Sequence, residues 1–202
     1  MFFYWDEWSI LHSLAKGGPW TWIWQPHMGH ASPFGRLLFL LEIRLFGDAY
    51  RGYVLVNIAL HALNSVLLFM LGRNLGHHVF SASLSSIWYS IFFVHAENLL
   101  WGMQSMLLGM VTLLLTSLLF TRQYCAGGGR RPLVFSVLAA FASAQFFAIG
   151  LVVGMLNVIF AAATDTPATK AGGRLWRLSL AHGCGSTVTA ACYLLITHGA
   201  NQ

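Results

Sequence analysis

Five stretches of the chain contain no Asp, Glu, Lys or Arg, and together they limit the folds that the chain can adopt. They are Tyr53–Leu71, Val79–Val94, Leu99–Phe120, Leu133–Ala163 and Leu178–Thr197. A helix of about 20 apolar residues crosses the hydrocarbon core of a bilayer. Charged residues make up only 8% of the chain, against about a quarter in a soluble domain. We therefore expect an all-α fold, a polytopic transmembrane helix bundle, in a multi-pass protein of a bacterial inner membrane or the endoplasmic reticulum.

These stretches predict a single membrane domain over residues 1–202, in three parts. Residues 53–121 form a three-span core, and residues 133–198 hold two or three further spans. The number stays open because Leu133–Ala163 is long for one upright span. It fits either one tilted helix or two short helices broken near Gln145.

Residues 1–52 are expected to form an outer-face loop and an interfacial helix. The loop runs to about Pro33 and is rich in tryptophan, which gathers at lipid–water interfaces. Phe34–Phe46 is apolar but too short for a span, which favours a short amphipathic helix on the membrane surface. In that position Glu42 and Arg44 would lie near solvent.

Three polar residues of the first span share one helical face. Asn57, His61 and Asn64 are spaced i, i+4, i+7. Such a stripe serves either as a seam of hydrogen bonds between helices or as the wall of a hydrophilic cavity. The sequence leaves both interpretations open.

The basic residues between the stretches predict the orientation of the spans. Arg73, Arg122, Arg130 and Arg131 lie in short loops, and such loops carry an excess of Lys and Arg on the cytoplasmic side. With those loops in the cytoplasm, the acids Asp6, Glu7 and Glu97 fall on the outer or lumenal side. Lys170, Arg174 and Arg177 also favour the cytoplasm, which supports two short helices within Leu133–Ala163.

Other binding functions receive little support. The net charge of +5 comes from loop residues and not from a basic run interleaved with aromatic residues, so we expect no nucleic-acid partner. The three cysteines form no CxxC pair. His27-x-x-His30 is a weak candidate pair of metal ligands. No cofactor is expected, although a divalent metal is not excluded.

Several motifs follow one another in an order that resembles a known superfamily. An acidic pair, Asp6-Glu7, is followed by three segments, in this order: Pro33-Phe34-Gly35-Arg36-Leu37-Leu38, then Leu55 to Asn64 (LVNIALHALN), then Phe92 to Trp101 (FFVHAENLLW). This order resembles the GT-C glycosyltransferases, most closely their protein O-mannosyltransferase-like branch, including the members that carry TPR repeats. The resemblance covers about residues 6–120, the N-terminal portion of such an enzyme.

The resemblance implies a hexosyltransferase that takes a sugar from a polyprenyl-phosphate donor in the membrane. Asp6 would be the catalytic base, supported by Glu7 and Glu97. Basic groups would hold the lipid phosphate and polar groups would line the substrate cavity; these residues are Arg36, Arg51, Asn57, His61, His95 and Gln104. The Arg-Pro pair of the family is reduced here to Arg36-Leu37, and His95 and Glu97 match its His-x-x-Glu element only loosely.

Two other functions stay open. The first is a non-catalytic membrane subunit or a degenerate fragment of an enzyme. The residues Met1 to Trp5 resemble the last turn of a helix, which would suit a fragment. The second is a transporter or a metal-binding membrane protein. The sequence does not select the sugar or the acceptor.

Overall fold

The computed structural model describes residues 5–26, 31–92, 99–164 and 173–199, and these are almost entirely helical. The elements are α1 (Trp5–Trp24), α2 (Pro33–Phe46), α3 (Arg51–Asn74), α4 (Val79–Ile91), η1 (Gly102–Gln104), α6 (Ser105–Cys125), α7 (Arg130–Phe146), η2 (Ala148–Val152), α8 (Val153–Thr164) and α10 (Arg174–Gly199). The described residues contain no strand. The expected all-α class is therefore confirmed.

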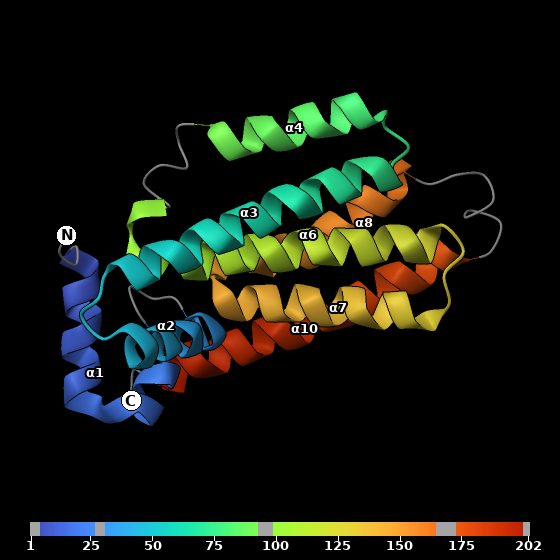
Figure 1. Ribbon diagram of the computed structural model, residues 1–202. Helices are drawn as coiled ribbons and strands as arrows, with labels where there is room; N and C mark the ends of the chain where they lie inside the picture. The colour runs from blue at the N-terminus through green and yellow to red at the C-terminus, as the bar shows by residue number, and fades with distance from the viewer. Residues whose placement is uncertain (1–4, 27–30, 93–98, 165–172, 200–202) are drawn as a thin grey trace.

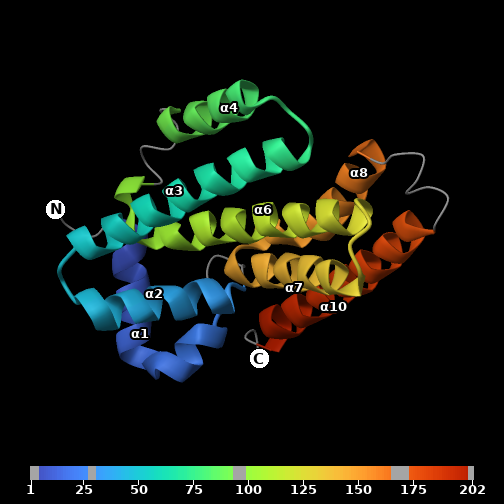
Figure 2. The same ribbon diagram turned by 45° about the vertical axis from the view of Figure 1, so that its right-hand side comes forward.

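Helices α3 and α6 lie side by side and run in the same direction (Figure 1). Side chains of α3 bond to α6 and the turn before it in matching order, Asn57 to Trp101 and Asn64 to Leu108. Helix α4 runs back along α3 (Figure 1). Ser86 and Ser90 of α4 bond to Ser65 of α3. Helix α7 runs antiparallel to α6, with α8 and α10 packed behind it, while α1 and α2 lie at the end where α3 begins (Figure 2).

Within the described residues, three helical segments are long and apolar enough to cross a membrane. They are Arg51–Asn74, Gly102–Cys125 and Arg174–His198. They correspond to the predicted spans Tyr53–Leu71, Leu99–Phe120 and Leu178–Thr197. The predicted span Val79–Val94 is represented by α4, which has only 13 residues and ends at Ile91.

The long apolar stretch Leu133–Ala163 forms two helices, so the two-helix alternative is confirmed. Helix α7 ends at Phe146, and Phe147 has extended backbone angles (φ −156°, ψ 142°). The chain turns back through η2 into α8. Gly150 permits this turn, because a Cβ there would lie 2.5 Å from the carbonyl group of Ser143.

The tryptophan-rich segment differs from the expected surface loop, because it forms helix α1. The helix is kinked at Gly18, whose φ of 73° suits a residue without a Cβ. Beyond the kink, the Trp22 indole donates a hydrogen bond to Ser13 Oγ (3.0 Å) and is fully buried. Trp22 packs with Phe39 and Tyr53, so tertiary packing orders a segment whose composition suggested a loop.

Helix α2 forms as predicted, but its polar face is turned inward. Arg36 and Glu42 are buried, whereas Leu37, Leu41 and Leu45 are more than half exposed. The expectation that Glu42 lies near solvent is therefore wrong. Arg44 is exposed as expected. The same inversion occurs in α3, whose outer face carries large aliphatic side chains, as in helices that face lipid.

The described Asp, Glu, Lys and Arg residues divide between the two ends of the bundle. One end, here called the arginine end, carries Arg73, Arg122, Arg130, Arg131, Arg174 and Arg177. Arg122 reaches Asn74 O and Arg174 reaches Tyr124 O, so these helix ends are in contact. The other end, here called the carboxylate end, carries Glu7, Glu42 and Asp48, together with four basic residues: Lys16, Arg36, Arg44 and Arg51. The two ends differ chiefly in their acids.

Buried polar side chains hold the second half of the bundle together. The Asn157 carboxamide on α8 accepts from Thr121 Oγ1 (2.5 Å) and donates to Ser117 Oγ (2.8 Å), both on α6. Ser136 of α7 contacts Thr121 Oγ1 and also His182 Nε2 of α10 (3.0 Å). One network therefore connects four helices.

Replacing Asn157 with Ala is expected to lower the free energy of unfolding by about 1–2 kcal/mol, because buried hydroxyls lose their partners. Thermal unfolding of the detergent-purified protein measures this change. Asn74→Ala is the matched control, since Asn74 is exposed at the end of α3. Equal effects of the two variants would show that the network adds no stability.

Candidate functional site at the carboxylate end

Two glutamates lie buried where α1, α2, α3 and the start of α6 meet. Glu7 comes from the first turns of α1 and Glu42 from the last turns of α2, and each is only 1% exposed. Around them lie Tyr50 and Tyr53 at the start of α3. Buried carboxylates are rare without a partner or a function, which makes this cluster the candidate site.

Glu7 is fixed by the beginning of the α6 segment. Its Oε1 accepts a hydrogen bond from the Met103 N–H (3.0 Å). The first N–H groups of a helix have no partner within the helix and carry a positive partial charge, so they favour a carboxylate there. Gly102 makes room for it, because a Cβ at this position would lie 2.9 Å from Glu7 Oε1 and 3.2 Å from Tyr53 Cβ.

Glu42 has one satisfied oxygen and one that is not. Ser105 Oγ donates to Glu42 Oε2 (3.1 Å), while Glu42 Oε1 has no hydrogen-bond partner within the described part of the chain. The pKa of Glu42 is raised to about 8, chiefly by burial and to a smaller extent by the charge of Glu7, while the Ser105 hydrogen bond lowers it in part. Glu42 therefore holds its proton at neutral pH, with a pKa suited to acid–base chemistry.

Arg36 is used in packing α1 against α2. Its guanidinium donates to the Trp22 carbonyl oxygen and lies over the Trp22 ring, 4.8 Å from the centroid. Burial lowers the pKa of Arg36 to about 10, so it stays charged at neutral pH. It thus caps carbonyl groups at the end of α1 and is 3% exposed.

The stripe on α3 forms a seam of hydrogen bonds between helices. Asn57 Nδ2 donates to Trp101 O (2.5 Å) and Leu99 O (3.3 Å). Asn64 bonds to Leu108 O (3.1 Å). His61 Nε2 lies 3.2 Å from Ser90 O. These contacts support the packing interpretation and not a hydrophilic cavity wall.

The other predicted site residues are only partly gathered here. Arg51 is the exposed first residue of α3, and Gln104 is half-buried in η1 beside Met103. Asp6 precedes Glu7 in α1, and its side chain is not among the described ones. His27, His30, His95 and Glu97 lie outside the described residues.

Sequence reasoning missed Glu42 and Ser105. The available signal was an acid with no neighbouring polar residue on its own helical face, flanked by Leu41 and Ile43. Such an acid in an apolar helix is expected to face a partner in the interior.

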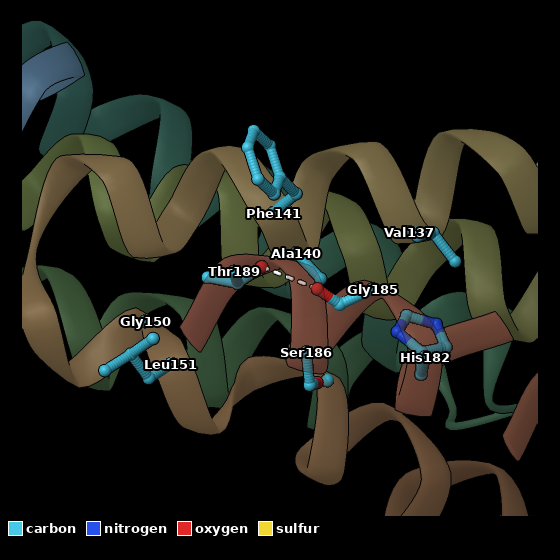
Figure 3. A pocket seen from close by; sticks show the side chains of 10 residues that line it. Val137, Ala140, Phe141, Gly150, Leu151, His182, Gly185, Ser186 and Thr189 are labelled. Atoms are coloured by element: carbon cyan, nitrogen blue, oxygen red, sulfur yellow. Dashed lines mark hydrogen bonds between the residues drawn. The ribbon is translucent and has the colours of Figure 1, made fainter. Parts of the chain in front are cut away.

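One cavity lies at the carboxylate end, and a second lies in the interior of the bundle. An apolar cavity of about 300 Å³ is lined by Trp24, Phe34, Phe141 and Leu195, among others, between α1, α2, α7 and α10. A much smaller one, about 10 Å³, lies beside His182 and Thr189 (Figure 3). The smaller has room for about one water molecule, so only the larger suits part of a substrate.

A metal site finds no support in the described part of the chain. No group of three or more His, Cys, Asp or Glu side chains gathers there. The weak pair His27 and His30 lies outside it, so that prediction stays untested.

The stability of the protein is expected to fall as pH rises from about 5 to 8. An unfolded Glu releases its proton near pH 4.5, whereas folded Glu42 keeps it to about pH 8, so in this range the folded state binds more protons. Glu42→Gln should flatten this dependence and raise the melting temperature at pH 8. Thermal unfolding in detergent from pH 5 to 9 measures both. Asp48→Asn, at an exposed position, should leave the dependence unchanged, and an unaltered profile in Glu42→Gln would contradict the assignment.

Gly102→Ala is expected to destabilise the protein by about 1–2 kcal/mol, because the new methyl group displaces Glu7 from the Met103 amide. Gly183→Ala is the control, since a Cβ on this α10 glycine meets nothing within 4 Å and should be neutral or stabilising. Thermal unfolding compares them. A neutral Gly102→Ala would show that Glu7 is not fixed there.

Comparisons with known proteins give no assignment. The chain matches no protein family, no curated protein and no solved structure. The GT-C relationship therefore depends on the motifs quoted above, and it stays a prediction.

Proposed function

We propose that this protein is a multi-pass membrane glycosyltransferase of the GT-C kind. It transfers a sugar from a polyprenyl-phosphate donor to an acceptor hydroxyl at the carboxylate end of the bundle. The observation that carries the proposal is the burial of Glu7 against the Met103 amide. This contact holds Glu7, the chain neighbour of Asp6, at the junction of four helices.

The surface supports membrane insertion. Three helical segments have the length and composition of spans. The outward face of α3 carries Leu55, Ile58 and Val66, and that of α2 carries Leu37 and Leu45. In water such surfaces would associate, whereas in lipid they are at no disadvantage.

The transfer uses one base and one cation. Asp6 takes the proton of the acceptor hydroxyl as its oxygen attacks the anomeric carbon of the donor sugar. The bond between that carbon and the phosphate oxygen breaks, and polyprenyl phosphate leaves with the electron pair. Arg51, which the resemblance assigns to the substrate, is an exposed cation at this end and would hold the phosphate, whereas Arg36 is engaged with Trp22.

The donor's prenyl chain requires an apolar path. The cavity of about 300 Å³ beside Phe34 and Leu195 lies at the same end of the bundle and opens between α1, α2, α7 and α10. Its lining is almost wholly apolar, as expected for a hydrocarbon chain.

A second candidate function, a non-catalytic membrane subunit, is favoured by one group of contacts. Arg36, Asn57 and His61, which the resemblance assigns to substrate, all make contacts within the bundle. A subunit that only packs against a partner needs these contacts and nothing more.

Asp6→Asn is expected to lower sugar transfer at least 100-fold while donor binding is kept, because loss of a general base affects the chemical step. Transfer from a polyprenyl-phosphate sugar is measured in membranes holding the full chain, and binding by native mass spectrometry. Asp48→Asn is the control acid from the same end and should retain transfer.

Equal transfer by Asp6→Asn and the unchanged protein would remove Asp6 from the role of base. Absence of donor binding in every form, with helices intact by circular dichroism, would favour the non-catalytic subunit.

A further inference from the structure

A large cavity lies at the arginine end, on the far side of the bundle from the glutamates. Its volume is about 620 Å³, and three of its lining residues are Arg130, Arg174 and Arg177. Arg130 is the first residue of α7 and Arg174 the first of α10. Two helix N-termini therefore flank the cavity together with three guanidinium groups, and both features favour an anion.

These arginines have no carboxylate to balance them within the described residues. The carboxylates described, Glu7, Glu42 and Asp48, belong to the opposite end; Asp165, like Lys170, lies outside the described residues. Arg174 donates a hydrogen bond to the Tyr124 carbonyl oxygen (3.1 Å). Arg130 and Arg177 are exposed, which leaves their donors available.

The α7 side of the cavity becomes apolar beyond Arg130. Leu133 and Val134, one turn into α7, line it, and Val134 is 53% exposed. Gly128 and Gly129 also line the cavity beside Arg130, and nothing lies within 4 Å of where a Cβ at Gly129 would be, so a ligand can approach the backbone there. A cationic rim that passes into an apolar wall matches a headgroup joined to acyl chains, and not a free polar anion.

We propose that this cavity binds the phosphate headgroup of an anionic phospholipid, with the acyl chains along Leu133 and Val134. Pockets lined by Lys and Arg between membrane helices on the cytoplasmic side suit such lipids, and the arginine-bearing loops are the ones predicted to face the cytoplasm. The inference requires the membrane placement proposed above but not the glycosyl transfer.

Binding of phosphatidylglycerol to the detergent-purified full chain, measured by native mass spectrometry, tests the proposal. The chain is expected to prefer phosphatidylglycerol over phosphatidylcholine of the same acyl chains. The double variant Arg130→Gln/Arg177→Gln should lose about 25-fold in affinity, about fivefold for each arginine near a phosphate. Both residues are exposed, so the fold should persist, and circular dichroism checks this.

Arg73→Gln/Arg131→Gln is the matched control. It removes two exposed arginines from the same end that do not line the cavity, so it should retain the affinity within about twofold. Arg130→Lys/Arg177→Lys keeps the charge and should retain most of the binding even if the glutamine variant is unstable.

Four outcomes would overturn the proposal. Equal loss in the control pair would show that the attraction is a general charge effect. Unchanged lipid affinity in the glutamine variant would exclude the cavity as the binding site. A loss of affinity in the lysine variant as large as that in the glutamine variant would show that charge does not hold the lipid there. Competition by inorganic phosphate at concentrations comparable with the lipid would assign the cavity to a free anion.

Discussion

The structure depends on hydrogen bonds from buried side-chain amides and hydroxyls to neighbouring helices. Asn64 on α3 bonds to Leu108 O and Thr112 Oγ1 of α6, and Asn157 on α8 bonds to Ser117 and Thr121 of α6. With apolar side chains turned outward, burial of hydrocarbon cannot by itself select how the helices pair. The polar contacts supply that selection, because each unsatisfied polar group in the interior costs free energy. Helix α6 is central because both sets of contacts end on it.

The same constraint shapes the carboxylate end. Glu7 is compensated by a backbone amide at a helix start, whereas Glu42 is compensated only by Ser105 and by keeping its proton. Arg36 is compensated by a carbonyl group and an aromatic face. Three ionisable side chains within two short helices are thus buried in three different ways. Helix α2 carries Arg36 and Glu42 among exposed leucines because both side chains turn inward, while Arg44 lies exposed near its end.

The two ends of the bundle are suited to different partners. Buried carboxylates with a perturbed pKa favour proton transfer, while exposed arginines around an apolar cavity favour a lipid headgroup. In the proposed arrangement the catalytic site and the lipid contact lie at opposite ends of the bundle. In this arrangement the arginines retain a role whether or not the protein is an enzyme.

The sequence by itself determined the helical class and the position of the long apolar helices, because these follow from local hydrophobicity and helix length. It left one or two helices open within Leu133–Ala163, and the structure has two, α7 and α8. The sequence also placed Asn57, His61 and Asn64 on one face, because that follows from helical spacing alone. Only the tertiary structure decided that this face bonds to α6 and α4 instead of lining a cavity, that the tryptophan-rich segment is a helix closed over Phe39, and that Glu42 points inward. The physical reason is that spacing along a helix fixes the face on which a residue lies. Which segment covers that face, and so whether the residue meets water or protein, depends on contacts between segments far apart in the chain.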